Sequence, residues 1–317
     1  MDCKCTVKSN QGQDISHYTE CKDSLPFKKI GIDDIQIIRG FLKEQPFGIC
    51  DFTVGGLYMW TEYFNYEYCV AGGTLFIKGD DVLAEGKTSF ALPVGAMPFS
   101  EALELLKRYA DGRNEELSLS EIPEDFLSYV DGAEITELAD WGDYMYLAED
   151  LATLTGHRYN KKRNKVNIFK KENEDYLYKP LTEETIPQIL SFLDGFEKRS
   201  DDKSSMAVYE IIQTRRILES YGIWDFVGGV LYAGGEIKAF TVGEIIKDIL
   251  YVHIEKADIG SDGAYQMINY LFAGDMTRSY GVKYINREED VGDLGLRQSK
   301  LSYQPLRIIK KFKAVIK

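Results

Sequence analysis

The densest group of basic side chains lies between residues 157 and 171, in the sequence HRYNKKRNKVNIFKK. This segment contains no acidic residue, although the whole chain carries a formal net charge of −13. A local concentration of positive charge in an acidic protein is typical of a site for a phosphate-bearing partner. We therefore predict that Arg158, Lys161, Lys162 and Arg163 bind the donor molecule of a reaction. The alternative interpretation is a solvated, charged helix.

A second polar group follows a predicted strand, in the sequence NREED at residues 286–290. The carboxyl ends of strands are where α/β proteins tend to bind ligands. The planar fork of Arg287 suits a carboxylate or a phosphate, and we predict that Asn286, Glu288 and Asp290 line the same site. The acidic residues also suit the first turn of a helix, and both interpretations can hold together.

His253, Glu255 and Lys256 lie along one predicted strand. His253 and Glu255 are two residues apart and therefore point to the same face. A carboxylate at this place could accept a proton from an attacking amine, so we predict Glu255, and after it His253, as the catalytic base. Paired polar residues on a solvated strand face are the alternative. The three histidines show no spacing typical of metal ligands, and we predict no metal site.

These residues require a strand, a turn and a helix to position them. Residues 249–258 alternate as a strand does, and the run from Ala264 has the apolar spacing of a helix. A glycine-marked turn between them would point backbone N–H groups at a ligand. We predict that Gly260, Gly263, Tyr265, Gln266 and Lys256 contribute to the donor site.

The first half of the chain shows a similar order of elements. The aromatic-rich residues 51–79 and the run at 88–95 predict strands joined by tight turns. Residues 149–161 and 289–300 share spaced acidic, glycine and basic positions at an offset of 139–140 residues, which favours two similar modules; coincidence is the alternative. We predict an irregular tail at 1–25, an N-terminal domain at 26–172 and a C-terminal domain at 173–317.

Composition limits the class of protein. Of 317 residues, 44% are hydrophobic and 13% aromatic, which is typical of a folded globular protein. The net charge of −13 disfavours DNA as a partner. Neither an apolar run of about 18 residues nor an apolar export signal is visible, so we expect a cytoplasmic protein without integral membrane association. Five cysteines, none beyond residue 69, predict reduced thiols.

Several stretches together carry a family resemblance. The most specific are HRYNKKRNKVN and NREEDVGDLGLRQSKLSY, with GEIKAFTVGE and VHIEKAD between them. From about Phe27 to its C-terminus the chain resembles the soluble C-terminal domain of phosphatidylglycerol lysyltransferases and their uncharacterised cytoplasmic relatives. The resemblance implies an α/β (α+β) protein of two tandem GNAT-like (acyl-CoA N-acyltransferase-like) domains, each a mixed, mostly antiparallel sheet flanked by helices. It also implies kinship with peptidoglycan-bridge aminoacyltransferases, which use aminoacyl-tRNA.

The resemblance implies an aminoacyl or acyl transferase acting on an amine or hydroxyl acceptor. Its candidate donors are acyl-coenzyme A and aminoacyl-tRNA, with tRNA as a possible partner and no certain cofactor. The turn at 259–264 differs from the family's Q/R-x-x-G-x-G/A pattern, and Gln298 stands where a catalytic tyrosine is common. These departures motivate a second hypothesis, a non-catalytic, degenerate GNAT pair that binds a small ligand or RNA.

Overall fold

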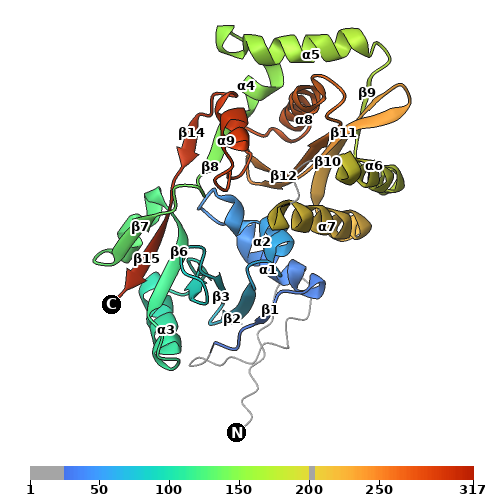
Figure 1. The fold of residues 1–317 in the computed structure, drawn as a ribbon. Helices are drawn as coiled ribbons and strands as arrows, with labels where there is room; N and C mark the ends of the chain where they lie inside the picture. Colours follow the sequence, from blue (N-terminus) through green and yellow to red (C-terminus); the bar gives the residue numbers. More distant parts are fainter. Residues whose placement is uncertain (1–24, 200–203) are drawn as a thin grey trace.

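The computed structural model describes residues 25–199 and 204–317. The predicted tail at 1–25 therefore lies outside the described residues, except for the buried Leu25. Two sheets, one above the other in Figure 1, form the body of the molecule. Each is mixed, mostly antiparallel and flanked by helices, so this part of the fold prediction is confirmed.

The first sheet has the order β1-β2-β3-β4-β6-β15-β7, and β5 pairs with β3. Its strands are β1 (Lys28–Lys29), β2 (Glu67–Ala71), β3 (Thr74–Asp80), β4 (Thr88–Phe90), β5 (Val94–Gly95), β6 (Leu117–Pro123), β7 (Glu134–Glu137) and β15 (Lys311–Ile316). Its single parallel pair is β4 with β6, and α3 (Phe99–Asp111) connects these two strands.

The second sheet has the order β14-β8-β13-β12-β11-β10-β9. Its strands are β8 (Asp143–Leu147), β9 (Leu177–Pro180), β10 (Phe226–Ala233), β11 (Glu236–Ile246), β12 (Ile249–Ala257), β13 (Tyr284–Asn286) and β14 (Arg307–Ile309). Here too one pair is parallel, β12 with β13, and α8 (Ala264–Tyr280) connects it. The two sheets thus share a meander, a helical crossover and one parallel strand.

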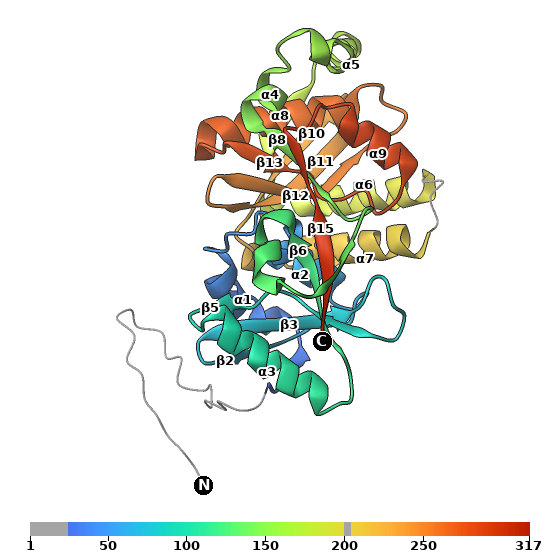
Figure 2. The ribbon, with the colours of Figure 1, turned by 90° about the vertical axis from the view of Figure 1, so that its left-hand side faces the viewer.

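Two strands exchange places between the halves of the chain. β8 lies in the second sheet between β13 and β14, whereas β15 lies in the first sheet between β6 and β7. Figure 2 shows β15 running from the upper half of the molecule into the lower sheet. The predicted domain boundary at residue 172 therefore separates strands that share a sheet. The boundary stays a prediction.

The two copies of the short motif that predicted the repeat do not lie at equivalent positions of two modules. Its first copy follows β8 and its second follows β13, and these strands are antiparallel neighbours in one sheet. The repeated topology instead relates residues 88–123 to residues 249–286. The short motif therefore does not mark equivalent places in two modules, although the modules themselves are present.

The remaining helices cover the sheets. They are α1 (Ile35–Leu42), α2 (Val54–Trp60), α4 (Ala148–Thr153), α5 (Asn160–Glu172), α6 (Ile186–Arg199), α7 (Ser205–Glu219) and α9 (Leu294–Leu301). α8 packs on the second sheet beneath α4 and α5, while α7 contacts α2 of the first half. Among the described helices, none combines the length and the apolar content that a membrane crossing needs.

Helix α2 replaces part of the strand predicted in residues 51–79. Thr53 caps it by accepting a hydrogen bond from the backbone N–H of Gly56 at 2.9 Å. Gly55 packs so closely on His253 that an added Cβ would overlap the imidazole. At Gly56 an added Cβ would overlap the backbone carbonyl oxygen of Cys50, so close packing rather than a turn explains the glycine pair.

Candidate functional site

Strands β12 and β13 part at the middle of the second sheet. Their parallel pairing ends at Tyr251 and Asn286, after which β12 continues to Ala257. Beyond Asn286 the chain turns, with Glu288 at a φ of 57°. We call the place where β12 and β13 part the opening. It lies at the carboxyl ends of these two parallel strands, where open α/β sheets bind their ligands.

An ion pair lies in this opening. The Nη2 atom of Arg287 donates to Oε1 of Glu255 at 2.9 Å, and Oε2 of Glu255 accepts from Asn269 at 3.3 Å. Both side chains of the pair are about nine-tenths buried, with 12% and 10% exposed. The Arg287 guanidinium also lies 4.8 Å from the ring centre of Tyr303. Glu255 is thus held as the counter-ion of Arg287, with both of its oxygens engaged.

Lys162 reaches the same opening from α5. Its Nζ lies 3.9 Å from the ring centre of Tyr303. Burial and the neighbouring charge of Arg287 lower the pKa of Lys162 to about 8, so the amine is easily deprotonated for a lysine. The Nη1 atom of Arg287 is buried and has no hydrogen-bond partner in the described structure. Lys162 and Arg287 therefore leave donor capacity for a partly negative oxygen.

The rest of the basic segment does not enter the opening. Arg158 pairs with Asp150 at 2.6 Å, and Lys165 with Asp262 at 2.7 Å. Arg163 donates to the carbonyls of Leu154 and Gly156, which holds the turn before α5. Lys161 is exposed.

The basic segment does not lie between the two sheets. Figures 1 and 2 show α5 at the end of the molecule far from the first sheet. α5 packs across α8 rather than between the sheets.

The glycine turn before α8 is covered. Gly263 has a φ of 80°, and an added Cβ would overlap the carbonyl oxygen of Lys165 in α5. Gly260 is exposed, and Tyr265 and Gln266 are half-buried. Burial raises the pKa of Tyr265 to about 12. The turn therefore serves the packing of α5 on α8, and only its outer part faces solvent.

His253 and Lys256 have charged partners on the other side of β12. The His253 ring lies between Glu288, 2.7 Å from Nδ1, and Glu244, 3.4 Å from Nε2. Burial alone would lower the pKa of His253, but the two carboxylates raise it to about 9. The two carboxylates therefore favour the protonated ring, and the assignment of His253 as an alternative base stays a prediction. Lys256 pairs with Glu210 of α7 at 2.7 Å.

Asn286 and Asp290 organise the loop after β13. The Nδ2 atom of Asn286 donates to Asp143 at 2.6 Å, and its Oδ1 accepts from the backbone of Glu288. Hydrogen bonds from Arg297 and Tyr144 lower the pKa of Asp290 although burial opposes the effect. Both residues position the 286–293 loop, from which Arg287 and Glu288 project.

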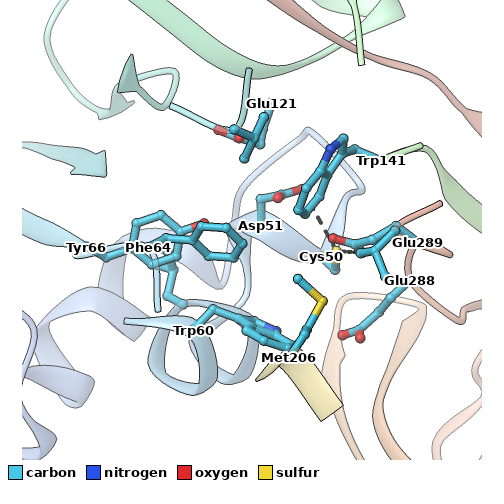
Figure 3. Close-up of a pocket in the computed structure, with 14 residues that line it drawn as sticks. Cys50, Asp51, Trp60, Phe64, Tyr66, Glu121, Trp141, Met206, Glu288 and Glu289 are labelled. Atoms are coloured by element: carbon cyan, nitrogen blue, oxygen red, sulfur yellow. Dashed lines mark hydrogen bonds between the residues drawn. The ribbon is translucent and has the colours of Figure 1, made fainter. Parts of the chain in front are cut away.

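A pocket lies between the two halves of the molecule (Figure 3). Residues of the first sheet, α2, α7 and the loop after β13 meet there. Its lining combines aromatic and acidic side chains: Cys50, Asp51, Gly56, Leu57, Trp60, Phe64, Tyr66, Val82, Glu121, Trp141, Met206, Glu288, Glu289 and Val291. Glu288 belongs to this wall and to the His253 contact, so it connects the pocket to β12.

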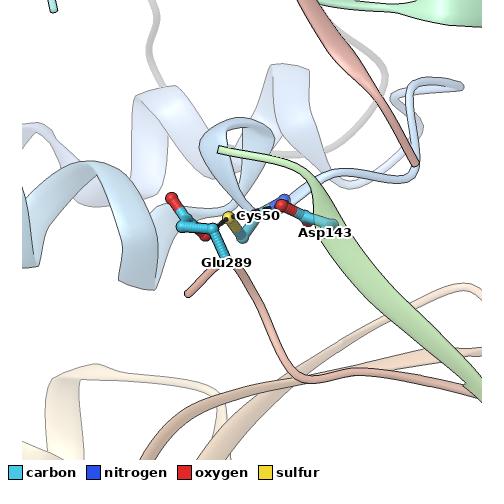
Figure 4. Close-up of side chains that lie close together, drawn as sticks. All are labelled: Cys50, Asp143 and Glu289. Atoms are coloured by element: carbon cyan, nitrogen blue, oxygen red, sulfur yellow. Dashed lines mark hydrogen bonds between the residues drawn. The ribbon is translucent and has the colours of Figure 1, made fainter. Parts of the chain in front are cut away.

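Lys311 lies buried beneath the pocket. Its Nζ is 2.5 Å from Asp51 and 2.7 Å from Asp143, and Cys50 Sγ is 3.5 Å away. Cys50 donates to Glu289 at 2.8 Å (Figure 4). Cys50, Asp143 and Glu289 have ligand-type atoms within 4.8 Å of one another. A metal ion would have to displace the ammonium of Lys311, which already supplies the positive charge.

Several carboxyl groups line the pocket, and they outnumber the buried ammonium group of Lys311. Burial raises the pKa of Asp51 to about 7 against the opposing effect of Lys311. Burial also raises the pKa of Glu121 to about 8, and that of Glu289 moves upward for the same reason. Carboxyl groups that titrate near neutrality in a concave site are characteristic of proton transfer.

Sequence reasoning missed most of this pocket, because its carboxylates come from positions 51, 121, 288 and 289. The available signal was the NREED segment after β13, from which Glu288 was predicted as a site residue.

The comparisons with known proteins agree on one family. Residues 45–315 match the family model described as phosphatidylglycerol lysyltransferase, C-terminal. A conserved protein of unknown function from Bacteroides thetaiotaomicron has 32% identity and a TM-score of 0.81, with 93% of this chain and 100% of that chain covered. The C-terminal domain of a putative lysylphosphatidylglycerol synthetase from Agrobacterium fabrum has 14% identity and a TM-score of 0.62, covering 89% and 91%.

An uncharacterized protein of Mycoplasmoides gallisepticum is 28% identical over 176 residues. The match spans 54% of each chain, about half the length of that curated relative. The structural likenesses confirm the predicted fold class.

Proposed function

The chain belongs to the family of phosphatidylglycerol lysyltransferase C-terminal domains, and from this we propose that it is an aminoacyl- or acyltransferase. It moves an activated amino acid or acyl group to an amine or hydroxyl acceptor, with aminoacyl-tRNA or acyl-coenzyme A as the candidate donor. The observation that carries the proposal is the opening between β12 and β13. Two cationic side chains, Lys162 and Arg287, meet there, and the Nη1 atom of Arg287 has no hydrogen-bond partner among the described residues.

Lys162 and Arg287 bind the carbonyl end of the donor. When a nucleophile attacks an ester, negative charge develops on the carbonyl oxygen, and fixed donors in a partly dry site stabilise it. The Glu255–Arg287 ion pair keeps the guanidinium in place before the donor arrives. The exposed basic side chains of α5 and of the turn before it, Lys161 and Arg158 among them, extend this positive surface toward the phosphates of the donor.

Glu255 remains the proposed base on this side of the sheet. Its carboxylate would have to exchange Arg287 for the proton of the attacking group. Because this exchange costs an ion pair, we expect Glu255 to contribute to orientation as much as to proton transfer.

Transfer of a labelled amino acid from charged tRNA tests the proposal. Lys162→Met removes the amine that reaches Tyr303, and we expect turnover to fall about 100-fold, the range seen when a charge-stabilising donor is lost. Lys43→Met makes the same change of charge at an exposed site in the first half and should leave turnover unchanged. Equal activity of the Lys162→Met variant and the wild type would reject the role given to this opening.

One observation favours the second candidate function, a binding protein without turnover. The glycine turn before α8, where a phosphate could meet backbone N–H groups, lies under α5. Salt-sensitive binding of tRNA with no detectable transfer from any donor would favour this function instead.

A further inference from the structure

The pocket between the two halves has an aromatic wall. Trp60, Phe64, Tyr66 and Trp141 all line it. Figure 3 shows Phe64 and Tyr66 on one side, Trp60 with Met206 below, and Trp141 on the other side. Aromatic faces attract cations through their quadrupole, by about 0.5–2 kcal/mol for each well-placed ring. The same wall suits the methylene groups of an alkyl chain.

Four carboxyl groups complete the lining, from Asp51, Glu121, Glu288 and Glu289. Among the residues that the structure describes, neither lysine nor arginine lines the pocket. Asp51 and Glu289 face the buried Lys311, and Glu288 contacts His253. Glu121 differs from them because its hydrogen bond is with the hydroxyl of Ser120, at 2.9 Å.

In Figure 3 Glu121 lies across the pocket from Trp60. The pocket therefore joins aromatic faces to a carboxyl group that has an uncharged partner.

We propose that this pocket binds the primary alkylammonium group of the acceptor, so that the acceptor is a cationic amine. That this ligand is the acceptor of a transfer reaction rests on the proposed function. That the ligand is a cationic amine rests on the pocket alone. Asp51, Glu288 and Glu289 have cationic partners in Lys311 and His253, whereas the hydrogen bond of Glu121 is with the uncharged Ser120. An ammonium ion has three donors and would stabilise the carboxylate form of Glu121.

The chemistry balances with the ester donor. The bound ammonium transfers one proton to Glu121, and the freed lone pair attacks the carbonyl carbon. A C–N bond forms as the ester C–O bond breaks, and the amine's second proton goes to the leaving oxygen. The products are an amide, an alcohol and the proton held by Glu121, which returns to solvent. A carboxyl group that titrates near neutrality can both accept and release that proton.

Binding of pentylammonium and of the neutral 1-pentanol, measured without any donor, tests the class of ligand. Trp60 and Trp141 line the pocket, so binding should change tryptophan fluorescence, and calorimetry gives the affinity. We expect pentylammonium to bind at least about ten-fold more tightly than pentanol, which corresponds to one ion pair. Glu121→Gln should remove about that factor for the ammonium and leave pentanol unchanged. Equal affinity of the two ligands for the wild type would overturn the proposal.

Glu104→Gln is the matched control, because it removes the same charge from an exposed position of α3; it should bind pentylammonium as the wild type does. If Glu121→Gln folds poorly by circular dichroism, Trp141→Leu tests the aromatic wall instead, and unchanged ammonium binding in that variant would also overturn the proposal. Ammonium binding without transfer from any donor would reject the proposed function but keep the ligand class. Transfer to a hydroxyl acceptor with no ammonium binding would reject this inference alone.

Discussion

His253 shows how a single side chain links two parts of the molecule. Its ring lies in β12, and its carboxylate partners are Glu244 of β11 and Glu288 of the loop after β13. Glu244 in turn accepts from the backbone N–H of Gly55 at 2.9 Å, at the start of α2. An imidazolium with two carboxylates thus connects the second sheet to a helix of the first half.

The protonation of His253 makes stability depend on pH. The pKa is raised from 6.5 to about 9 in the folded protein. A raised folded pKa gives stability that is fully present below 6.5 and is lost as the pH rises through about 9. We expect the free energy of unfolding to fall between these values by on the order of 1–3 kcal/mol.

Urea unfolding at a series of pH values measures this loss in the wild type and in His253→Gln. Asp51 and Glu121 also titrate in the window, but they contribute to both proteins. The wild-type curve should therefore fall more steeply than the variant's. Parallel curves would show that His253 is not the source of the loss.

Gly55 in helix α2 and Gly40 in helix α1 give a prediction at the scale of one element. An added Cβ at Gly55 would overlap the ring of His253, whereas at Gly40 of α1 nothing lies within 4 Å. Both are helical glycines, so Gly40→Ala should stabilise the protein by about 0.4–1 kcal/mol. Gly55→Ala should destabilise it by roughly 1–3 kcal/mol, because the buried His253 must move. The difference in urea midpoints checks both values, and a stabilising Gly55→Ala would contradict the packing described here.

The same elements show what the sequence could predict. The strand β12, the helix α8 and the strand β13 follow from local periodicity, and the structure contains all three. Helix α2 does not follow, because its glycines have low helix propensity and the close contact of Gly55 is with His253, 198 positions away. The sequence predicts separate roles for Glu255, as a base, and for Arg287, as a ligand-binding residue. Spacing along the chain does not show that the two side chains meet.

At the scale of the whole molecule, the exchange of β8 and β15 was beyond sequence reasoning. Both are short strands of ordinary pattern, and no local signal states which sheet a strand joins. The exchange brings Asp143 of β8 and Lys311 of β15 to 2.7 Å, with both side chains fully buried. One hydrophobic cluster contains Phe76 and Leu119 of the first sheet and Val242 and Ile254 of the second. The two halves therefore share a core and a buried ion pair.

Separated halves should consequently fail to fold. A fragment of residues 25–172 lacks β15, which leaves β6 and β7 without the strand between them. A fragment of residues 173–317 lacks β8, the strand that joins β13 to β14. β13 then keeps its pairing with β12, but β14 is separated from the sheet. Each fragment also exposes half of the shared core and one partner of the Asp143–Lys311 pair, whose separation costs several kcal/mol.

We expect neither fragment alone to give a dispersed NMR spectrum or a cooperative unfolding transition. The two fragments refolded together should regain both, because each supplies the strand that the other lacks. The full chain should unfold in urea as a single transition, with the same midpoint by tryptophan fluorescence and by circular dichroism. A cooperative transition of residues 25–172 alone would show that the first sheet is stable without β15, and would contradict the dependence of each half on the other.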